Sequence, residues 1–204
     1  MSVKTWNLAL DFVENFDCSI TIGGGEPTLH KNFRDFLLDT LAAELDIPPF
    51  IITNGSTKHA NLLYKLAKSE VIGCEVSQDW YHDPIDPEIV KKFRSINAIR
   101  DVTHGGTREV LPKGRAVETG LLDEVDPEDD EGQHCACETL FIDPLGNVKA
   151  CGCPDAQILF SLHDEEWEEK WRTLQEETDY EIGNQCWHSI KSHPIFGEGL
   201  ETVC

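Results

Sequence analysis

The chain has 204 residues and a formal net charge of −21, from 38 acidic and 17 basic side chains. Its length suits one domain with a hydrophobic core and a small appended module, but not two full domains. The acidity argues against direct binding of nucleic acid, and the absence of a signal peptide and of any run near the roughly 20 apolar residues that span a bilayer predicts a cytoplasmic protein.

Helical and strand-like segments alternate along the first half of the chain. Apolar residues recur at helical spacing over 2–16, and the apolar run 18–22 predicts a strand that ends in the turn 23–27. The alternation continues with a helix at 31–45, a strand at 50–55, a helix at 57–70, a strand at 71–77, a helix at 86–96 and a strand at 98–104. This order is typical of right-handed β-α-β units, so we expect an α/β fold with about four parallel strands.

After residue 110 the alternation ends. Residues 118–133 are interpreted as an acidic, solvated linker. Beyond it, 139–144 and 147–151 predict a β-hairpin around a Leu-Gly-Asn turn, and 164–177 predict a helix. We therefore expect a core at 1–117, the linker at 118–133 and a cysteine-rich module at 134–204.

The turn after the first predicted strand reads Gly-Gly-Gly-Glu-Pro at 23–27. Glycines at the carboxyl end of a parallel strand let the backbone approach a ligand closely. A dinucleotide site or a P-loop does not fit, because Glu26 would repel a phosphate and no Gly-Lys-Ser/Thr sequence follows. A carboxylate at this position suits a cationic group such as an amine.

The turn resembles that of the radical S-adenosylmethionine (radical SAM) family, which has the motif Gly-Gly-Glu-Pro before a helix. The resemblance continues with Thr-Asn-Gly at 53–55, Ser-x-Asp at 77–79 with His82, and Gly114 in the stretch LPKGRA. It implies a partial (β/α)6 barrel in which Glu26 holds the amino group of SAM. The cofactor-binding residues that it implies are Gly24, Gly25, Glu26, Pro27, Asn54, Ser77 and Arg115.

Two of these roles have ordinary alternatives. The resemblance implies that Ser77 approaches the ribose or carboxylate of SAM and that Arg115 reaches its carboxylate region. Ser77 is alternatively a strand-end cap, and Arg115 a surface charge. Asp79 and His82 are alternatively solvent-facing loop residues.

The cluster motif of the family, C-x-x-x-C-x-x-C, is missing from these residues. In the family, three thiolates bind a [4Fe-4S] cluster whose open iron chelates SAM. Here Cys18 is followed by no second cysteine for 55 residues, and the helix at 2–16 corresponds to the helix after the cluster loop. We expect an incomplete barrel without its first strand that does not cleave SAM by itself, through either a shortened or misstarted sequence or loss of the reaction.

Eight cysteines without a secretion signal are more often metal ligands or reduced thiols than disulfides. Two C-x-C pairs flank the predicted hairpin, whose ends lie together, and one later cysteine is a further candidate; the candidate ligands are Cys135, Cys137, Cys151, Cys153 and Cys186. They suit an auxiliary iron-sulfur cluster or structural Zn²⁺ equally well. The module resembles the SPASM or twitch domain, from which the C-x-C spacing departs, and reduced buried cysteines are the alternative.

Two functions follow as hypotheses. The first is a radical SAM-like protein with an auxiliary iron-sulfur or Zn²⁺ site, related to enzymes that modify peptides or small molecules; no catalytic residue is assigned. The second is a non-catalytic acidic protein that binds a macromolecular partner. The unpaired edge of the strand at 18–22 favours a homodimer, and neither nucleic acid nor a membrane is an expected partner. A Zn²⁺-stabilised α/β protein without SAM is a weaker third hypothesis.

Overall fold

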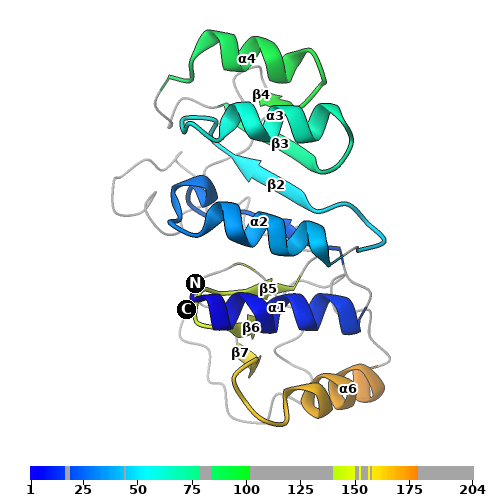
Figure 1. The fold of residues 1–204 in the computed structure, drawn as a ribbon. Coiled ribbons are helices and arrows are strands. Elements are labelled where there is room, and N and C mark those ends of the chain that lie inside the picture. Colours follow the sequence, from blue (N-terminus) through cyan, green and yellow to red (C-terminus); the bar gives the residue numbers. More distant parts are fainter. Residues whose placement is uncertain are drawn as a thin grey trace, which may run out of the picture. The chain divides into compact units, whose positions relative to one another are not determined.

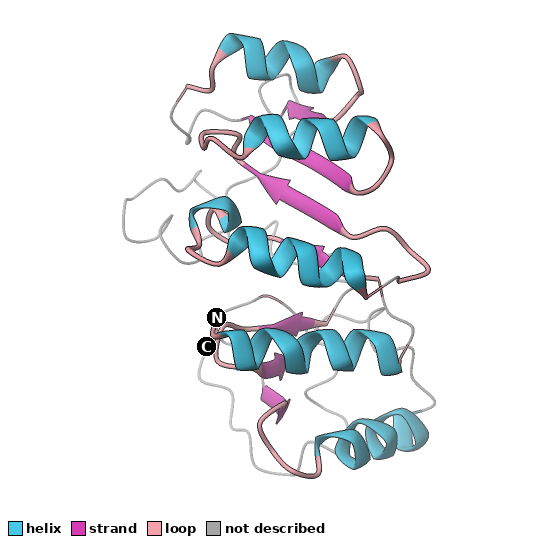
Figure 2. Ribbon diagram, viewed as in Figure 1, coloured by secondary structure: helices cyan, strands magenta, loops and turns pink. Residues whose placement is uncertain are grey.

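The computed structural model describes residues 1–16, 19–43, 45–78, 84–101, 140–149, 152, 156 and 158–178. The chain forms two compact units, Leu10–Arg108 and Met1–Ala9 with Glu109–Cys204. Their helices and strands are shown in Figures 1 and 2. None of the described helices is long and apolar enough to cross a membrane. The expected boundaries of the acidic linker 118–133 lie outside the described residues and stay a prediction.

The unit Leu10–Arg108 contains a four-stranded parallel sheet in the order β1-β2-β3-β4. Helices α2, α3 and α4 lie on one side of it (Figure 2). The elements are β1 (Thr21–Ile22), the 3-10 helix η1 (Pro27–Leu29), α2 (Phe33–Ala42), β2 (Phe50–Thr53), α3 (Ala60–Lys68), β3 (Gly73–Gln78), α4 (Pro87–Arg94) and β4 (Ile99–Asp101). The predicted α/β fold with a parallel sheet is confirmed, whereas the partial barrel without its first strand remains a prediction.

Strand register determines which side chains face the helices. Ile51 pairs with Cys74 and Thr53 with Val76, so these four side chains share one face of the sheet. Helices α2, α3 and α4 cover that face with apolar residues, and the resulting buried core consists of Phe33, Leu37, Ile51, Ala60, Leu63, Ile72, Cys74, Val76, Ile89 and Phe93. Ser77 lies in β3 on the opposite face, where it is half-buried.

The first strand is shorter and the second helix starts later than predicted. β1 comprises Thr21–Ile22 instead of 18–22, although the carbonyl of Ile20 already accepts a hydrogen bond from Phe50 N at 2.9 Å; residues 17 and 18 are outside the described part. α2 begins at Phe33 because the chain first forms η1, which Glu26 caps. The turn after β1 is therefore a structured element and not a simple loop.

The other unit contains a three-stranded antiparallel sheet in the order β5-β6-β7. Its elements are the first part of α1 (Val3–Asn15), β5 (Phe141–Ile142), β6 (Asn147–Lys149), β7 (Ile158–Ser161) and α6 (Trp167–Thr178). The predicted hairpin is confirmed by the pairing of Phe141 with Lys149 and of Ile142 with Val148. The strand β7 was not predicted from the sequence, and α6 begins later than expected because residues 162–166 form turns.

Asp143 closes the hairpin turn. Its Oδ1 accepts hydrogen bonds from Leu145 N at 2.8 Å and Asn147 N at 3.1 Å, and its Oδ2 accepts from Asn147 Nδ2 at 2.9 Å. Partial burial opposes ionisation, but these hydrogen bonds prevail and lower the pKa of Asp143. Gly146 completes the turn with a φ of 89°, so the turn spans 143–146 and Asn147 already belongs to β6.

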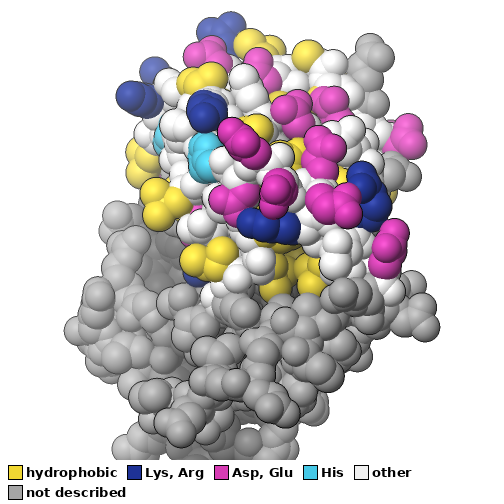
Figure 3. Space-filling model, turned by 90° about the horizontal axis from the view of Figure 1, so that it is seen from below, with side chains coloured by type: hydrophobic (Ala, Val, Ile, Leu, Met, Phe, Trp, Pro, Cys, Tyr) yellow, Lys and Arg dark blue, Asp and Glu magenta, His cyan; other side chains and the backbone are white. Residues whose placement is uncertain are grey.

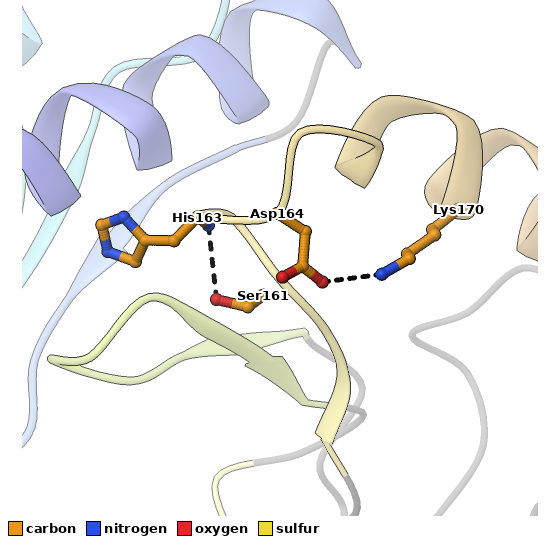
Figure 4. A network of polar contacts seen from close by, with 4 residues as sticks. All are labelled: Ser161, His163, Asp164 and Lys170. Carbon is orange, nitrogen blue, oxygen red and sulfur yellow. Dashed lines mark hydrogen bonds and ion pairs between the residues drawn. The ribbon is translucent and has the colours of Figure 1, made fainter.

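The core of this unit joins the sheet to α6. Its buried apolar side chains come from α1, β6, β7, α6 and the turn before α6: Trp6, Ala9, Val148, Phe160, Leu162, Trp167, Trp171 and Leu174. Asp164 lies in the turn before α6, and its Oδ2 forms an ion pair with Nζ of Lys170 in α6 at 2.7 Å (Figure 4). In the same turn His163 N donates to Ser161 Oγ at 3.3 Å. The hydrogen bond from Lys170 lowers the pKa of Asp164.

Cys74 is a free, buried cysteine in the core, as its position in a predicted apolar strand suggested. Burial is the main cause that raises the pKa of its thiol to about 12, and the carboxylates of Glu26 and Glu75 raise it further. The thiol is therefore neutral at physiological pH and unreactive, because the thiolate is the nucleophile.

We expect Cys74 in the folded protein to react with iodoacetamide at pH 8 at least about 100-fold more slowly than in denaturant. Mass spectrometry of the peptide that contains Cys74 measures the extent of alkylation over time. The same peptide labelled after unfolding provides the reference rate. Equal rates in the folded and unfolded protein would contradict a buried, protonated thiol.

Candidate functional site

Two polar turns lie side by side at the carboxyl edge of the parallel sheet. The turn 23–27 follows β1, the Thr-Asn-Gly turn follows β2, and these two strands are paired. Gly24, Gly25 and Gly55 have φ values of 81°, 51° and 68°, a region that favours glycine. A Cβ placed on Gly24 or Gly25 would meet no atom within 4 Å, so the space beside this backbone is open.

The carboxylate of Glu26 joins the two turns. Its Oε1 accepts hydrogen bonds from Thr28 N at 3.0 Å, from Thr28 Oγ1, and from Thr53 Oγ1 at 2.8 Å. Its Oε2 accepts one from Asn54 N at 2.6 Å. Glu26 is half-buried, whereas the side chains of Thr28 and Thr53 are buried. The carboxylate group of Glu26 thus connects the two turns.

Two hydrogen-bonded chains end on Oε1. In the first, Gly55 N donates to Thr53 Oγ1 at 3.1 Å, and Thr53 donates onward to Glu26. In the second, His59 N donates to Thr57 Oγ1 at 3.3 Å. The same oxygen, Thr57 Oγ1, lies 2.6 Å from Thr28 Oγ1. Because the single hydroxyl hydrogen of Thr28 goes to Glu26, Thr57 is the donor in that contact. All donors therefore point towards the carboxylate.

The two oxygens of Glu26 differ in their remaining capacity. A carboxylate oxygen has two lone pairs, and Oε1 already receives three donors while Oε2 receives one. Among the residues that the structure describes, no basic side chain forms an ion pair with Glu26. Oε2 can therefore accept a further hydrogen bond from a cationic ligand.

Five of the predicted cofactor-binding residues meet at this edge: Gly24, Gly25, Glu26, Pro27 and Asn54. Pro27 is the first residue of η1, and Asn54 Oδ1 accepts from Ser56 N at 2.9 Å, which stabilises the Thr-Asn-Gly turn. Ser77 belongs to β3, the neighbour of β2. No described hydrogen bond links Ser77 to the Glu26 turn.

Sequence reasoning assigned no role to the three threonines of the site, Thr28, Thr53 and Thr57, although Thr53 belongs to the Thr-Asn-Gly motif. Glu-Pro-Thr at 26–28 has the pattern of an N-cap followed by proline at the first helical position, which is the signal that could have revealed the Thr28 contact. The contacts of Thr53 and Thr57 with the turn after β1 had no local signal, because the partners are 27 and 29 residues apart.

The remaining predicted site residues lie outside the described part of the chain: Asp79, His82, Gly114, Arg115, Cys135, Cys137, Cys151, Cys153 and Cys186. Cys18 and Cys204 also lie outside it. Within the described ranges no group of three or more His, Cys, Asp or Glu residues is arranged to hold a metal ion. The cysteine site therefore stays a prediction.

A hollow of about 730 Å³ lies at the other end of the parallel sheet. It is lined by the first residues of β2 and β3, Phe50 and Gly73, together with Ala98 before β4. Its lining is apolar except for Cys74, Glu75 and Asn97. None of the predicted cofactor-binding residues lines it. It is therefore separate from the two turns.

No protein-family model and no curated protein matches the chain. A solved structure does match, the crystal structure of BtrN in complex with AdoMet and 2-DOIA. The TM-score is 0.55 at 17% sequence identity, over 91% of this chain and 80% of the BtrN chain. BtrN is a radical SAM enzyme, so the likeness shows that this chain has a radical SAM-like fold.

Proposed function

We propose that the chain is a radical SAM-like protein that binds SAM at the turn after β1 and holds a metal site in its cysteine-rich module. The polypeptide of residues 1–204 does not cleave SAM by itself. The observation that carries the proposal is the Glu26 carboxylate, which four hydrogen bonds hold in place while Oε2 retains acceptor capacity. The radical SAM-like fold supports it.

The residues at the turn fit the amino group of SAM. An ammonium group needs a negative acceptor and room to approach, which Glu26 Oε2 and the open space beside Gly24 and Gly25 supply. One charge-assisted hydrogen bond contributes about 1.5–3 kcal/mol, so binding through this contact alone is weak. Ser77 is the residue proposed for the ribose or carboxylate of SAM, and Arg115 the residue proposed for its carboxylate region.

The residues do not fit the catalytic cluster of the family. A [4Fe-4S] cluster of this type needs three closely spaced thiolates, and C-x-x-x-C-x-x-C does not occur in residues 1–204. Without thiolates to hold an open iron, nothing in these residues chelates SAM for reductive cleavage. We infer that SAM bound to this polypeptide stays intact.

The second part of the proposal is an auxiliary iron-sulfur or Zn²⁺ site formed by the five candidate cysteines Cys135, Cys137, Cys151, Cys153 and Cys186. The antiparallel pairing of Phe141 with Lys149 supports it, because the outer ends of β5 and β6 are neighbours in the hairpin. Cys137 precedes β5 by four residues and Cys151 follows β6 by two. Thiolates from both segments suit a soft metal site.

The test of SAM binding is equilibrium dialysis of the anaerobically purified protein with radiolabelled SAM. We expect saturable binding, and no 5′-deoxyadenosine after addition of dithionite and reconstitution with iron and sulfide. Absence of binding would contradict the SAM site. Formation of 5′-deoxyadenosine would contradict the inference that this chain leaves SAM intact.

Metal analysis and the visible absorption spectrum test the cysteine module. We expect either Zn²⁺ or an iron-sulfur absorption band, lost when Cys151 and Cys153 are both replaced by serine. The control is Cys74→Ser, because Cys74 is a free core cysteine and its replacement should leave the metal content unchanged. Protein without metal after reconstitution would contradict this part of the proposal.

A second candidate function is binding of a macromolecular partner. Acidic side chains gather on one face of the described residues (Figure 3). The exposed carboxylates in and before α6 include Glu165, Glu166, Glu168, Glu169 and Glu176. Both exposed cations there, Lys170 and Arg172, are already paired with Asp164 and Glu169. A specific basic partner recovered by affinity capture, together with absence of SAM binding, would favour this function over the first.

A homodimer through the edge of the parallel sheet remains a further proposal. Among the described strands β1 pairs with β2 alone, so its outer edge offers backbone groups to another strand. Light scattering on the native protein measures the mass directly. A monomeric mass at high concentration would contradict the dimer.

A further inference from the structure

We propose that Thr53 and Thr28 are positioning residues for Glu26: by binding Oε1 they fix the carboxylate so that Oε2 presents its remaining lone pair to the ammonium group of the ligand. This rests on the proposed SAM site. The two carboxylate oxygens then have different roles: Oε1 is bound by the protein, and Oε2 accepts a hydrogen bond from the ligand.

The contacts of Oε1 support the division. Thr28 contributes both its backbone N–H and its hydroxyl, and Thr53 contributes its hydroxyl at 2.8 Å. Three donors leave no acceptor position on this atom. Since Thr28 and Thr53 are 4% and 2% exposed, their hydroxyl groups have no water to compete with the carboxylate.

Orientation is the property that these contacts control. The terminal torsion of a glutamate side chain has a broad, roughly two-fold preference, so an unanchored carboxylate turns easily. Anchoring Oε1 to η1 and to the end of β2 fixes the plane of the group. Asn54 N then occupies one lone pair of Oε2 at 2.6 Å, and a single acceptor position with a defined direction remains.

Thr53 and Thr28 each accept a further hydrogen bond, which strengthens their own hydrogen bonds to Glu26 Oε1. Thr53 receives Gly55 N–H, and Thr28 receives the hydroxyl of Thr57, which in turn receives His59 N–H. Successive hydrogen bonds that run in one direction polarise each other. Thr57 therefore acts on Glu26 through Thr28 without touching the carboxylate.

The test compares the affinity for SAM with that for the analogue of SAM that lacks only the amino group. The native protein is expected to prefer SAM by at least about tenfold, which is the lower end of the contribution of one charge-assisted hydrogen bond. Thr53→Val removes the donor and should reduce this preference to about twofold or less, whereas Thr53→Ser keeps the hydroxyl and should retain it. Affinity for the analogue should be the same in all three proteins.

A second variant covers the case in which Thr53→Val does not fold. Thr57 contacts Glu26 only through the hydroxyl of Thr28. Thr57→Val should therefore lower the preference for SAM by about threefold, and Thr57→Ser should restore it. Circular dichroism and thermal unfolding establish that each variant tested is folded.

The outcomes separate the inference from the proposed function. If the native protein does not bind SAM, both are wrong. If it binds SAM with the expected preference, and the valine variants keep that preference while folded, the positioning role alone is wrong. Equal loss of affinity for SAM and for its analogue would show a merely structural role and would also overturn the inference.

Discussion

Replacing Glu26 with alanine is expected to lower the free energy of unfolding by about 3 kcal/mol, because buried donors lose their acceptor. The hydroxyl groups of Thr28 and Thr53 and the backbone N–H of Asn54 all end on this carboxylate. Each buried polar group left without a partner costs about 1–3 kcal/mol. The loss should appear in urea denaturation monitored by circular dichroism, as a lower midpoint with little change in slope.

Glutamine is a sharper variant at the same position. Both oxygens of Glu26 accept hydrogen bonds, so an amide in either orientation points its own N–H groups at a donor. We therefore expect Glu26→Gln to cost about 2 kcal/mol, although it preserves size and shape. Glu14→Ala, at an exposed carboxylate in α1, is the matched control and should cost little. A fully stable glutamine variant would contradict the described bonding.

Replacing Gly55 with alanine is expected to lower the free energy of unfolding by about 3 kcal/mol, from backbone strain and overpacking together. With a φ of 68° the residue is left-handed, and a side chain there costs about 1–2 kcal/mol. The added Cβ would also lie 3.2 Å from Val76 Cγ1, which is tighter than ordinary contact, and 3.4 Å from Ile85 Cγ2, at the limit of ordinary contact.

Gly24→Ala separates the two contributions. Gly24 has a φ of 81°, but a Cβ there would meet no atom within 4 Å, so its cost should be backbone strain alone, about 1 kcal/mol. The same urea titration measures both variants. Equal losses for Gly24→Ala and Gly55→Ala would indicate that Val76 and Ile85 move aside without cost.

The hydrogen bonds of Glu26 connect the two sequence motifs to each other. Gly-Gly-Glu-Pro and Thr-Asn-Gly were identified separately, as two turns on successive strands. In the structure Glu26 of the first receives hydrogen bonds from Thr53 and Asn54 of the second, so the motifs form one bonded unit. A substitution in either motif should therefore disturb the other.

Much of the fold could be predicted because its signals are local. The apolar spacing of Trp6, Leu10 and Val13 indicates the helix that the structure has at Val3–Asn15. Alternating strands and helices up to residue 101 likewise predict the parallel sheet. β7 escaped prediction because its four residues, Ile-Leu-Phe-Ser, are an apolar run too short to distinguish from a loop or a helix start.

The α/β fold with a parallel sheet could be predicted from residue order alone, and a carboxylate among glycines at a strand end already favours an amine over a phosphate as the expected ligand. Which oxygen of Glu26 is free depends on Thr53 and Asn54, which β2 brings beside β1. That arrangement arises only when the parallel strands pair and place both carboxyl ends at one edge of the sheet. Long-range pairing of this kind has no local signature, so the number of hydrogen bonds that each oxygen of Glu26 accepts could be determined only from the folded chain.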